Sequence, residues 1–99
     1  MKLIIKNPKT NVANFFRRAG YHFLRKVGEE MVFAKRLTDQ PFPRFHAFCK
    51  VGKDKFIINL HLDHKKASYE GQRKHSGEYG EGSELLREEA KRLKLVDGS

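Results

Sequence analysis

Apolar and polar residues alternate along two neighbouring stretches of the chain, residues 44–51 and 56–64. A period of two is typical of strands that bury one face, and residues 52–55 between them suit a tight turn. We therefore expect an antiparallel hairpin. One register makes one of its faces apolar throughout, and burial of that face fixes the register. The apolar pairs are Val51 with Phe56, Cys49 with Ile58, Ala47 with Leu60, and Phe45 with Leu62.

The same register decides which side chains share the opposite face of the hairpin. It pairs Arg44 with Asp63, His46 with His61, Phe48 with Asn59, and Lys50 with Ile57. Directly opposed side chains lie about 4.5–5.5 Å apart at Cβ, so His46 and His61 are expected to be neighbours. Asp63 follows His61 by two residues and therefore points to the same face.

A helical period precedes this hairpin. Four apolar residues at positions i, i+3, i+4 and i+7 form one stripe and predict a helix within residues 10–20. Thr10 or Asn11 can cap the exposed N–H groups of its first turn, and Gly20 suits the left-handed position that ends a helix. The stripe consists of Val12, Phe15, Phe16 and Ala19.

Two weaker strand signals flank that helix. Residues 21–26 and 30–37 are rich in aromatic and β-branched side chains around Gly28, and they predict a second hairpin. Both of its faces carry apolar residues, so the pattern does not show which face is buried. Residues 2–5 are a candidate short strand.

The end of the chain predicts a second helix. Ser83 can cap a helix from Glu84 to about Leu95, in which Glu88 and Arg92 form a favourable i,i+4 pair. The expected fold class is therefore α+β. We expect an antiparallel sheet of about four strands with two helices packed on one face, in the order (β)-α-β-β-β-β-α.

The length suits a single small basic domain spanning residues 1–99, because single domains centre on about 100–150 residues. One connection stands out, a Gly-rich basic loop over residues 64–82. It far exceeds the median connection of about 4–6 residues, and loops of such length are usually functional or disordered.

Charge adds a functional expectation to this fold. The chain has 21 Lys and Arg against 12 Asp and Glu, a net charge of +9. Residues 1–75 hold 17 basic and 6 acidic residues, or +11, whereas residues 76–99 hold 4 and 6, or −2. A basic body of this kind attracts polyanions. Nucleic acid is the commonest such partner, an acidic protein is an alternative, and charge that only confers solubility also remains open.

Several classes of protein are not expected. No apolar run approaches the ~20 residues of a membrane span, and the first residues hold too short an apolar run for a signal peptide. We therefore expect a soluble, cytoplasmic protein without a membrane partner. The single cysteine, Cys49, excludes an internal disulfide and a Cys-rich zinc site, and we expect it in the core. No glycine motif has the lysine of a nucleotide-binding loop, and we expect no cofactor.

His46, His61 and Asp63, with Arg44 beside them, allow three interpretations. The first is catalysis, in which one histidine is the base and the other the acid in metal-independent cleavage of RNA at its 2′-hydroxyl. The second is a metal site with nitrogen and oxygen ligands. The third is structural, with polar residues on a wet or nucleic-acid-facing sheet surface. The residues by themselves favour the third, so enzymatic activity is an alternative rather than the expectation.

Phe48 lies between His46 and Lys50 on the same predicted face. An aromatic ring among cations on an open sheet face suits stacking on nucleic-acid bases. The loop adds basic clusters with tyrosines between them, which suit phosphate contacts and stacking. The expected nucleic-acid contacts are Arg44, Phe48, Lys50, Lys65, Lys66, Tyr69, Arg73, Lys74 and His75.

Residues 15–36 resemble the opening of HicA-type toxins, in which a helix ending in Ala-Gly-aromatic is followed by a hairpin. The matching residues are Phe16, Ala19, Gly20, Tyr21, Arg25, Gly28 and Phe33. The resemblance covers 22 of the 99 residues and implies a fold like that of double-stranded-RNA-binding domains, with affinity for RNA. The family cleaves RNA with a histidine just after the turn glycine. Glu29 and Glu30 stand there in this chain, so the catalytic role is not carried over.

These observations predict a small basic nucleic-acid-binding domain for RNA or a single strand. Recognition of a specific duplex sequence is not expected, because no predicted helix has a dense basic face suited to the major groove. Two alternatives remain open. One is a metal-independent ribonuclease or phosphodiesterase that uses His46 and His61, and the other is a protein-interaction module for an acidic partner.

Overall fold

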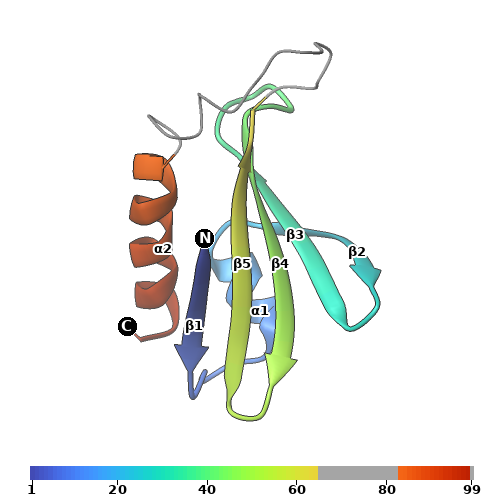
Figure 1. Cartoon of the computed structure of the whole chain (residues 1–99), viewed down its shortest axis with the longest axis vertical. Helices are drawn as coiled ribbons and strands as arrows, with labels where there is room; N and C mark the ends of the chain where they lie inside the picture. The colour runs from blue at the N-terminus through green and yellow to red at the C-terminus, as the bar shows by residue number, and fades with distance from the viewer. Residues whose placement is uncertain (65–82, 99) are drawn as a thin grey trace.

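The computed structural model describes residues 1–64 and 83–98 of the chain. Five strands form one antiparallel sheet in the spatial order β1-β5-β4-β3-β2, and two helices complete an α+β fold (Figure 1). The predicted fold class and the predicted order of elements are confirmed. The elements are β1 (Lys2–Lys6), α1 (Val12–Arg18), β2 (His22–Val27), β3 (Glu30–Arg36), β4 (Arg44–Gly52), β5 (Lys55–Asp63) and α2 (Ser83–Gly98).

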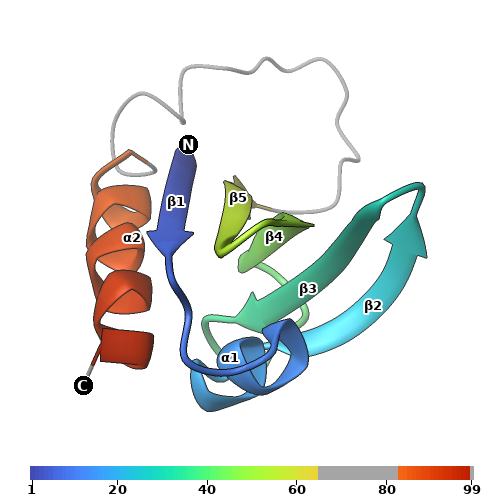
Figure 2. The same cartoon turned by 90° about the horizontal axis from the view of Figure 1, so that it is seen from below.

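Both helices lie on the same side of the sheet, as expected (Figure 2). Phe15 and Phe16 of α1 and Leu93 of α2 have no exposed surface, and they share one core with side chains of the sheet. The ring of Phe16 stacks on that of Phe33 in β3, with 4.2 Å between the ring centroids. One face of the sheet is therefore the interior of the domain, and α1 and α2 leave the other face uncovered.

The hairpin of β4 and β5 has the predicted register in every pair. Its turn consists of two residues, Lys53 and Asp54, since β4 ends at Gly52 and β5 begins at Lys55. Cys49 and its partner Ile58 are fully buried, as expected for an apolar face that packs under the helices. Burial raises the pKa of the Cys49 thiol to about 12, so this cysteine is an inert core residue.

The expected number of strands is one too low, because residues 2–6 form a full edge strand. This strand, β1, pairs antiparallel with β5 from Lys2 opposite Asn59 to Lys6 opposite Lys55. Leu3 and Ile5 alternate toward the core and are buried. The partner strand lies far away in the sequence, so the short local pattern could not show that a strand would pair there.

Helix α1 begins and ends with the expected signals. Asn11, rather than Thr10, is the N-cap, and its side-chain oxygen accepts a hydrogen bond of 2.8 Å from the backbone N–H of Asn14. Gly20 has a φ of 94°, a left-handed conformation that favours glycine over any residue with a Cβ. This turn directs the chain from α1 into β2.

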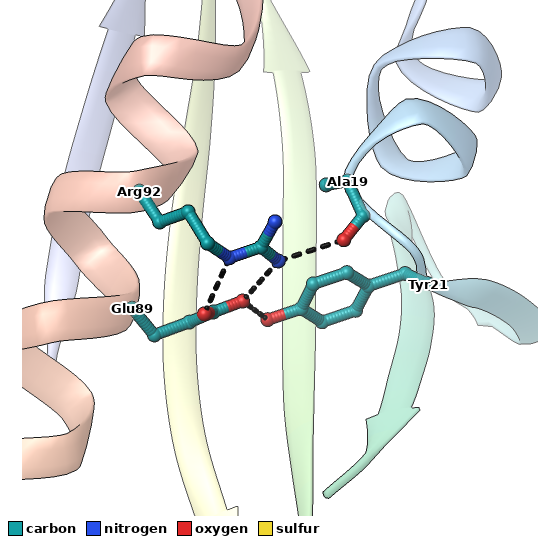
Figure 3. A network of polar contacts seen from close by, with 4 residues as sticks. All are labelled: Ala19, Tyr21, Glu89 and Arg92. Carbon is teal, nitrogen blue, oxygen red and sulfur yellow. Dashed lines mark hydrogen bonds and ion pairs between the residues drawn. The ribbon is translucent and has the colours of Figure 1, made fainter.

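Helix α2 is fastened to the rest of the domain by buried polar contacts (Figure 3). The expected i,i+4 pair of Glu88 and Arg92 is wrong, because Arg92 binds Glu89 instead, through bonds of 2.8 and 2.9 Å. Glu89 also accepts a 2.6 Å hydrogen bond from the hydroxyl of Tyr21, and Arg92 donates one of 2.7 Å to the carbonyl of Ala19. Neither described helix is long and apolar enough to cross a membrane.

Candidate functional site

The candidate site is on the sheet surface that faces away from α1 and α2, which we call the open face. Figure 1 views the sheet with α1 behind it, and Figure 2 shows the β2–β3 hairpin curving away from the helices. Alternation along the two central strands places every second side chain on this face. The middle of the open face consists of Arg44, His46, Phe48 and Lys50 from β4, and Asn59, His61 and Asp63 from β5.

His46 is paired with Asp63 rather than with the other histidine. Its Nδ1 lies 2.8 Å from Asp63 Oδ2, and the histidine side chain is 12% exposed. A carboxylate only accepts hydrogen bonds, so the imidazole proton is on Nδ1 and is donated to Asp63. If this site is catalytic, its base is therefore a histidine oriented by a carboxylate, and His61 is an exposed neighbour.

The surroundings of His46 favour its neutral form. Burial lowers the pKa of His46 below its ordinary value of 6.5, and the positive charges of Arg44 and Arg25 act in the same direction. Asp63 opposes this shift but does not reverse it. A neutral imidazole with its proton on Nδ1 has a free lone pair on Nε2. His46 is therefore a hydrogen-bond acceptor at Nε2 or a base, not a cation for phosphate binding.

Nε2 of His46 has no hydrogen-bond partner in the described part of the chain, and it is shielded from solvent. The Nε atom of Arg44 is in the same condition, although it lies 3.7 Å from Asp63 Oδ2. Buried polar atoms almost always have partners, and a buried group without one costs about 1–3 kcal/mol. The cluster of His46, Asp63 and Arg44 is thus incomplete as it stands.

Phe48 brings an aromatic surface to the same place. Its ring centroid lies 5.3 Å from that of His46 and 5.5 Å from that of His61, the latter in an edge-to-face arrangement. Arg44 is held at the end of this row, with its guanidinium carbon 4.8 Å from the ring centroid of Phe42. The open face therefore combines a cluster of neighbouring rings with guanidinium groups.

Arg25 is a member of the site that the alternating pattern did not predict. A β-bulge shifts the register between Phe23, which pairs with Phe33, and Arg25, which pairs with Val32. Without the extra residue, Arg25 would point to the helix-covered face. The bulge turns it to the open face, where its charge acts on His46. In the sequence, Arg25 is marked only as the basic residue of the HicA-like layout. That layout does not show which face of the sheet the side chain occupies.

On the open face, small side chains of β3 lie between the larger side chains of β4 and those of β2. Val32 lies between Phe48 on one side and Arg25 on the other, and Ala34 lies between His46 and His22. Both Val32 and Ala34 are fully buried although they point away from the helices. Larger neighbours on β2 and β4 therefore cover β3 on the open face. Both faces of β3 are buried in its middle, whereas β2, the other strand of this hairpin, is largely exposed on both faces.

The remaining predicted site residues have different positions. Lys50 is exposed and lies 3.9 Å from Glu29, a surface pair that contributes little to stability. No three described His, Cys, Asp or Glu side chains are grouped so that they could hold a metal ion, so the metal interpretation of His46, His61 and Asp63 gains no support. Outside the described residues lie Lys65, Lys66, Tyr69, Arg73, Lys74, His75 and, apart from His64, the whole predicted loop.

Comparison of the chain with models of protein families, with characterised proteins and with solved structures finds no match. The resemblance to HicA-type toxins stays a prediction, and the case for a function depends on the open face itself.

Proposed function

We propose that the protein binds single-stranded nucleic acid, with RNA as the favoured class, on its open face. The observation that carries this proposal is the ring of Phe48 beside those of His46 and His61, on a sheet surface that α1 and α2 leave uncovered. The charges of Arg44 and Arg25 act on the same place. Aromatic rings stack on bases of any sequence, and nearby cations bind the phosphates. The net charge of +9 supplies long-range attraction for a polyanion.

A single strand suits this surface better than a duplex. Reading a duplex in its major groove usually requires a helix or a two-stranded ribbon that enters the groove. Helix α2 mixes acidic and basic side chains on its exposed positions, such as Glu84, Arg87, Glu88 and Lys91. Helix α1 has basic residues only in its last turn, at Arg17 and Arg18.

The test compares two aromatic residues on opposite sides of the sheet. Phe48→Ala is expected to weaken binding of a fluorescent single-stranded RNA about 5- to 150-fold, because stacking contributes about 1–3 kcal/mol per base. Phe23→Ala is the control, since Phe23 is a 51% exposed ring that contacts Phe33 on the other side. Fluorescence anisotropy measures both affinities, and circular dichroism confirms that the variants fold.

Wild-type affinity should also fall steeply as salt increases, because bound phosphates release counterions. No binding at ~50 mM salt would refute the proposal. Equal losses of affinity in Phe48→Ala and Phe23→Ala would show that Phe48 is not part of the interface. Equal competition by an acidic polypeptide and by RNA, with no effect of Phe48→Ala, would instead favour the protein-interaction module.

The hydrogen bond between His46 and Asp63 favours a second candidate function, metal-independent cleavage of RNA. In this reaction Nε2 of His46 takes the proton of a 2′-hydroxyl, and that oxygen forms a bond to the adjacent phosphorus. The bond from phosphorus to the 5′-oxygen breaks, and protonated His61 donates a proton to the leaving oxygen. Asp63 orients the imidazole so that Nε2 faces the substrate, as carboxylates do in other histidine-dependent enzymes.

Cleavage of end-labelled RNA in the presence of EDTA tests this second candidate. A rate that peaks near neutral pH and disappears in both His46→Ala and His61→Ala is the expected result. Unchanged cleavage in His46→Ala would show that another group, or a contaminating nuclease, is responsible.

A further inference from the structure

Nε2 of His46, which has no hydrogen-bond partner among residues 1–64 and 83–98, points to the kind of strand that the open face binds. Because Asp63 holds the proton of Nδ1, Nε2 presents a lone pair and needs a hydrogen-bond donor. The backbone phosphate of a nucleic acid is only an acceptor, and deoxyribose has no donor within a strand. The donors of a single strand are the ribose 2′-hydroxyl and the amino and imino groups of the bases.

The order of side chains along β4 distinguishes these donors. Arg44, His46 and Phe48 are successive residues on one face, roughly 6.6 Å apart at two strand residues per step. They offer a cation, an acceptor and an aromatic ring in that order. One nucleotide presents a phosphate, a sugar hydroxyl and a base in the same order. A base stacked on Phe48 therefore has its own sugar beside His46, whose ring centroid is 5.3 Å from that of Phe48.

We propose that Nε2 of His46 accepts a hydrogen bond from the ribose 2′-hydroxyl of a bound strand, so that the open face selects RNA over DNA. This inference rests on the proposed binding of single strands. Nε2 is shielded in the structure, and the groups whose charge acts on His46 include the long side chains of Arg44 and Arg25. Side chains around Nε2 must move when a strand binds, so that the sugar reaches the imidazole.

Three oligonucleotides of one sequence test the selection. One is RNA, the second is DNA with uracil in place of thymine, and the third is 2′-O-methyl RNA, which keeps the ribose oxygen but has no donor. Wild-type protein is expected to bind the RNA roughly three- to tenfold more tightly than either of the others, the range of one net hydrogen bond. Gel analysis confirms that the RNA stays intact during the measurement.

Two ring substitutions assign the selection to one atom. His46→Phe keeps an aromatic ring but removes the acceptor, so its affinities for RNA and for DNA should become equal. His61→Phe is the matched control on the neighbouring strand, directly opposite His46 in the register, and should keep the preference for RNA. The ¹⁵N resonance of His46 Nε2 in the wild-type protein gives a second measurement that needs no variant. It should move on addition of RNA and stay in place on addition of DNA.

The outcomes separate this inference from the proposed function. Failure of every strand to bind overturns both. Equal wild-type affinity for RNA, DNA and 2′-O-methyl RNA overturns only the selection, as does a preference for RNA that survives in His46→Phe. A preference that follows the identity of the base and persists in DNA would show that Nε2 accepts from a base donor, and the assignment to the 2′-hydroxyl would be wrong.

Discussion

Two clusters of polar side chains lie on opposite sides of the sheet, and they differ in how fully their hydrogen-bonding groups are paired. On the helix-covered side, Tyr21, Glu89 and Arg92 satisfy one another and the carbonyl of Ala19 (Figure 3). On the open face, the cluster of His46, Asp63 and Arg44 leaves two buried nitrogens, His46 Nε2 and Arg44 Nε, without a partner among the described residues. The first cluster is closed and holds a helix in place. The second can accept one hydrogen bond at His46 Nε2 and donate one at Arg44 Nε.

The pKa shifts in the two clusters also differ, and each shift favours the role of its group as a donor or an acceptor. Burial and the adjacent Glu89 carboxylate raise the pKa of the Tyr21 hydroxyl far above its ordinary value, so this group keeps its proton and stays a donor. The pKa of His46 is lowered, so this group loses its proton readily and stays an acceptor at Nε2. A cluster that needs nothing further is expected to matter for stability, and an incomplete one is expected to matter for binding.

The largest expected effect comes from the core that separates the two clusters. Phe16→Ala removes a fully buried ring that stacks on Phe33, and the free energy of unfolding should fall by about 3–5 kcal/mol. Phe48→Ala, on the open face, should cost clearly less stability because its ring is only half-buried. Chemical denaturation followed by circular dichroism measures both. A larger loss from Phe48→Ala would mean that the open face is part of the core.

Loss of the closed cluster should have the next largest effect. Glu89→Ala removes the acceptor for Tyr21 and Arg92, and hydrogen bonds to charged groups are each worth about 1.5–3 kcal/mol. We therefore expect a loss of stability of about 2–3 kcal/mol and unchanged affinity for RNA. The control is Glu88→Ala, an exposed carboxylate on the same turn, which should change stability by less than about 0.5 kcal/mol. Similar results for the two variants would show that the cluster does not hold α2.

A change in the incomplete cluster should affect stability little and RNA recognition strongly. Asp63→Ala removes the acceptor that holds the proton on Nδ1 of His46. Stability should fall by only about 0.5–1.5 kcal/mol, because the Asp63 side chain is 35% exposed and solvent weakens its bond, whereas Glu89 is buried. The preference for RNA should disappear, because Nε2 is no longer kept as the acceptor. Denaturation and anisotropy on the same preparation check the two effects. If Asp63→Ala is stable and still prefers RNA over DNA, Asp63 has no part in the recognition of RNA.

The smallest expected effect is on the pH dependence of stability. The folded protein binds a proton at His46 more weakly than the unfolded chain does, because burial and the charges of Arg44 and Arg25 outweigh that of Asp63. Protonation therefore favours unfolding, and the contribution of His46 to stability is present above pH 6.5 and is lost as the pH falls below it. Denaturation of wild type and His46→Phe between pH 5 and 8 measures the difference. The loss of stability between pH 8 and pH 5 should be smaller for the variant than for wild type. Equal losses in the two proteins would contradict this account.

Local patterns predicted most of what lies within neighbouring segments. The alternation of residues 44–51 and 56–64 specified the register of β4 and β5, because a one-residue slip would bury polar side chains under the helices. The cap at Asn11 and the left-handed Gly20 marked the ends of α1 for reasons of backbone geometry. By contrast, β1 gave only a weak signal, since it gains its hydrogen bonds from a strand far away in the sequence.

The sequence by itself determined that His46, His61, Phe48 and Asp63 would share one face, because side chains in a strand alternate and the apolar partners must be buried. Only the tertiary structure decided which of these groups interact. It gave His46 a carboxylate partner, left its Nε2 without a partner in the described part of the chain, and turned Arg25 to the same face through a bulge in β2. Rotamers, bulges and contacts between distant strands depend on packing among many residues at once. Periodicity fixes the face on which a side chain lies, and packing fixes what that side chain touches.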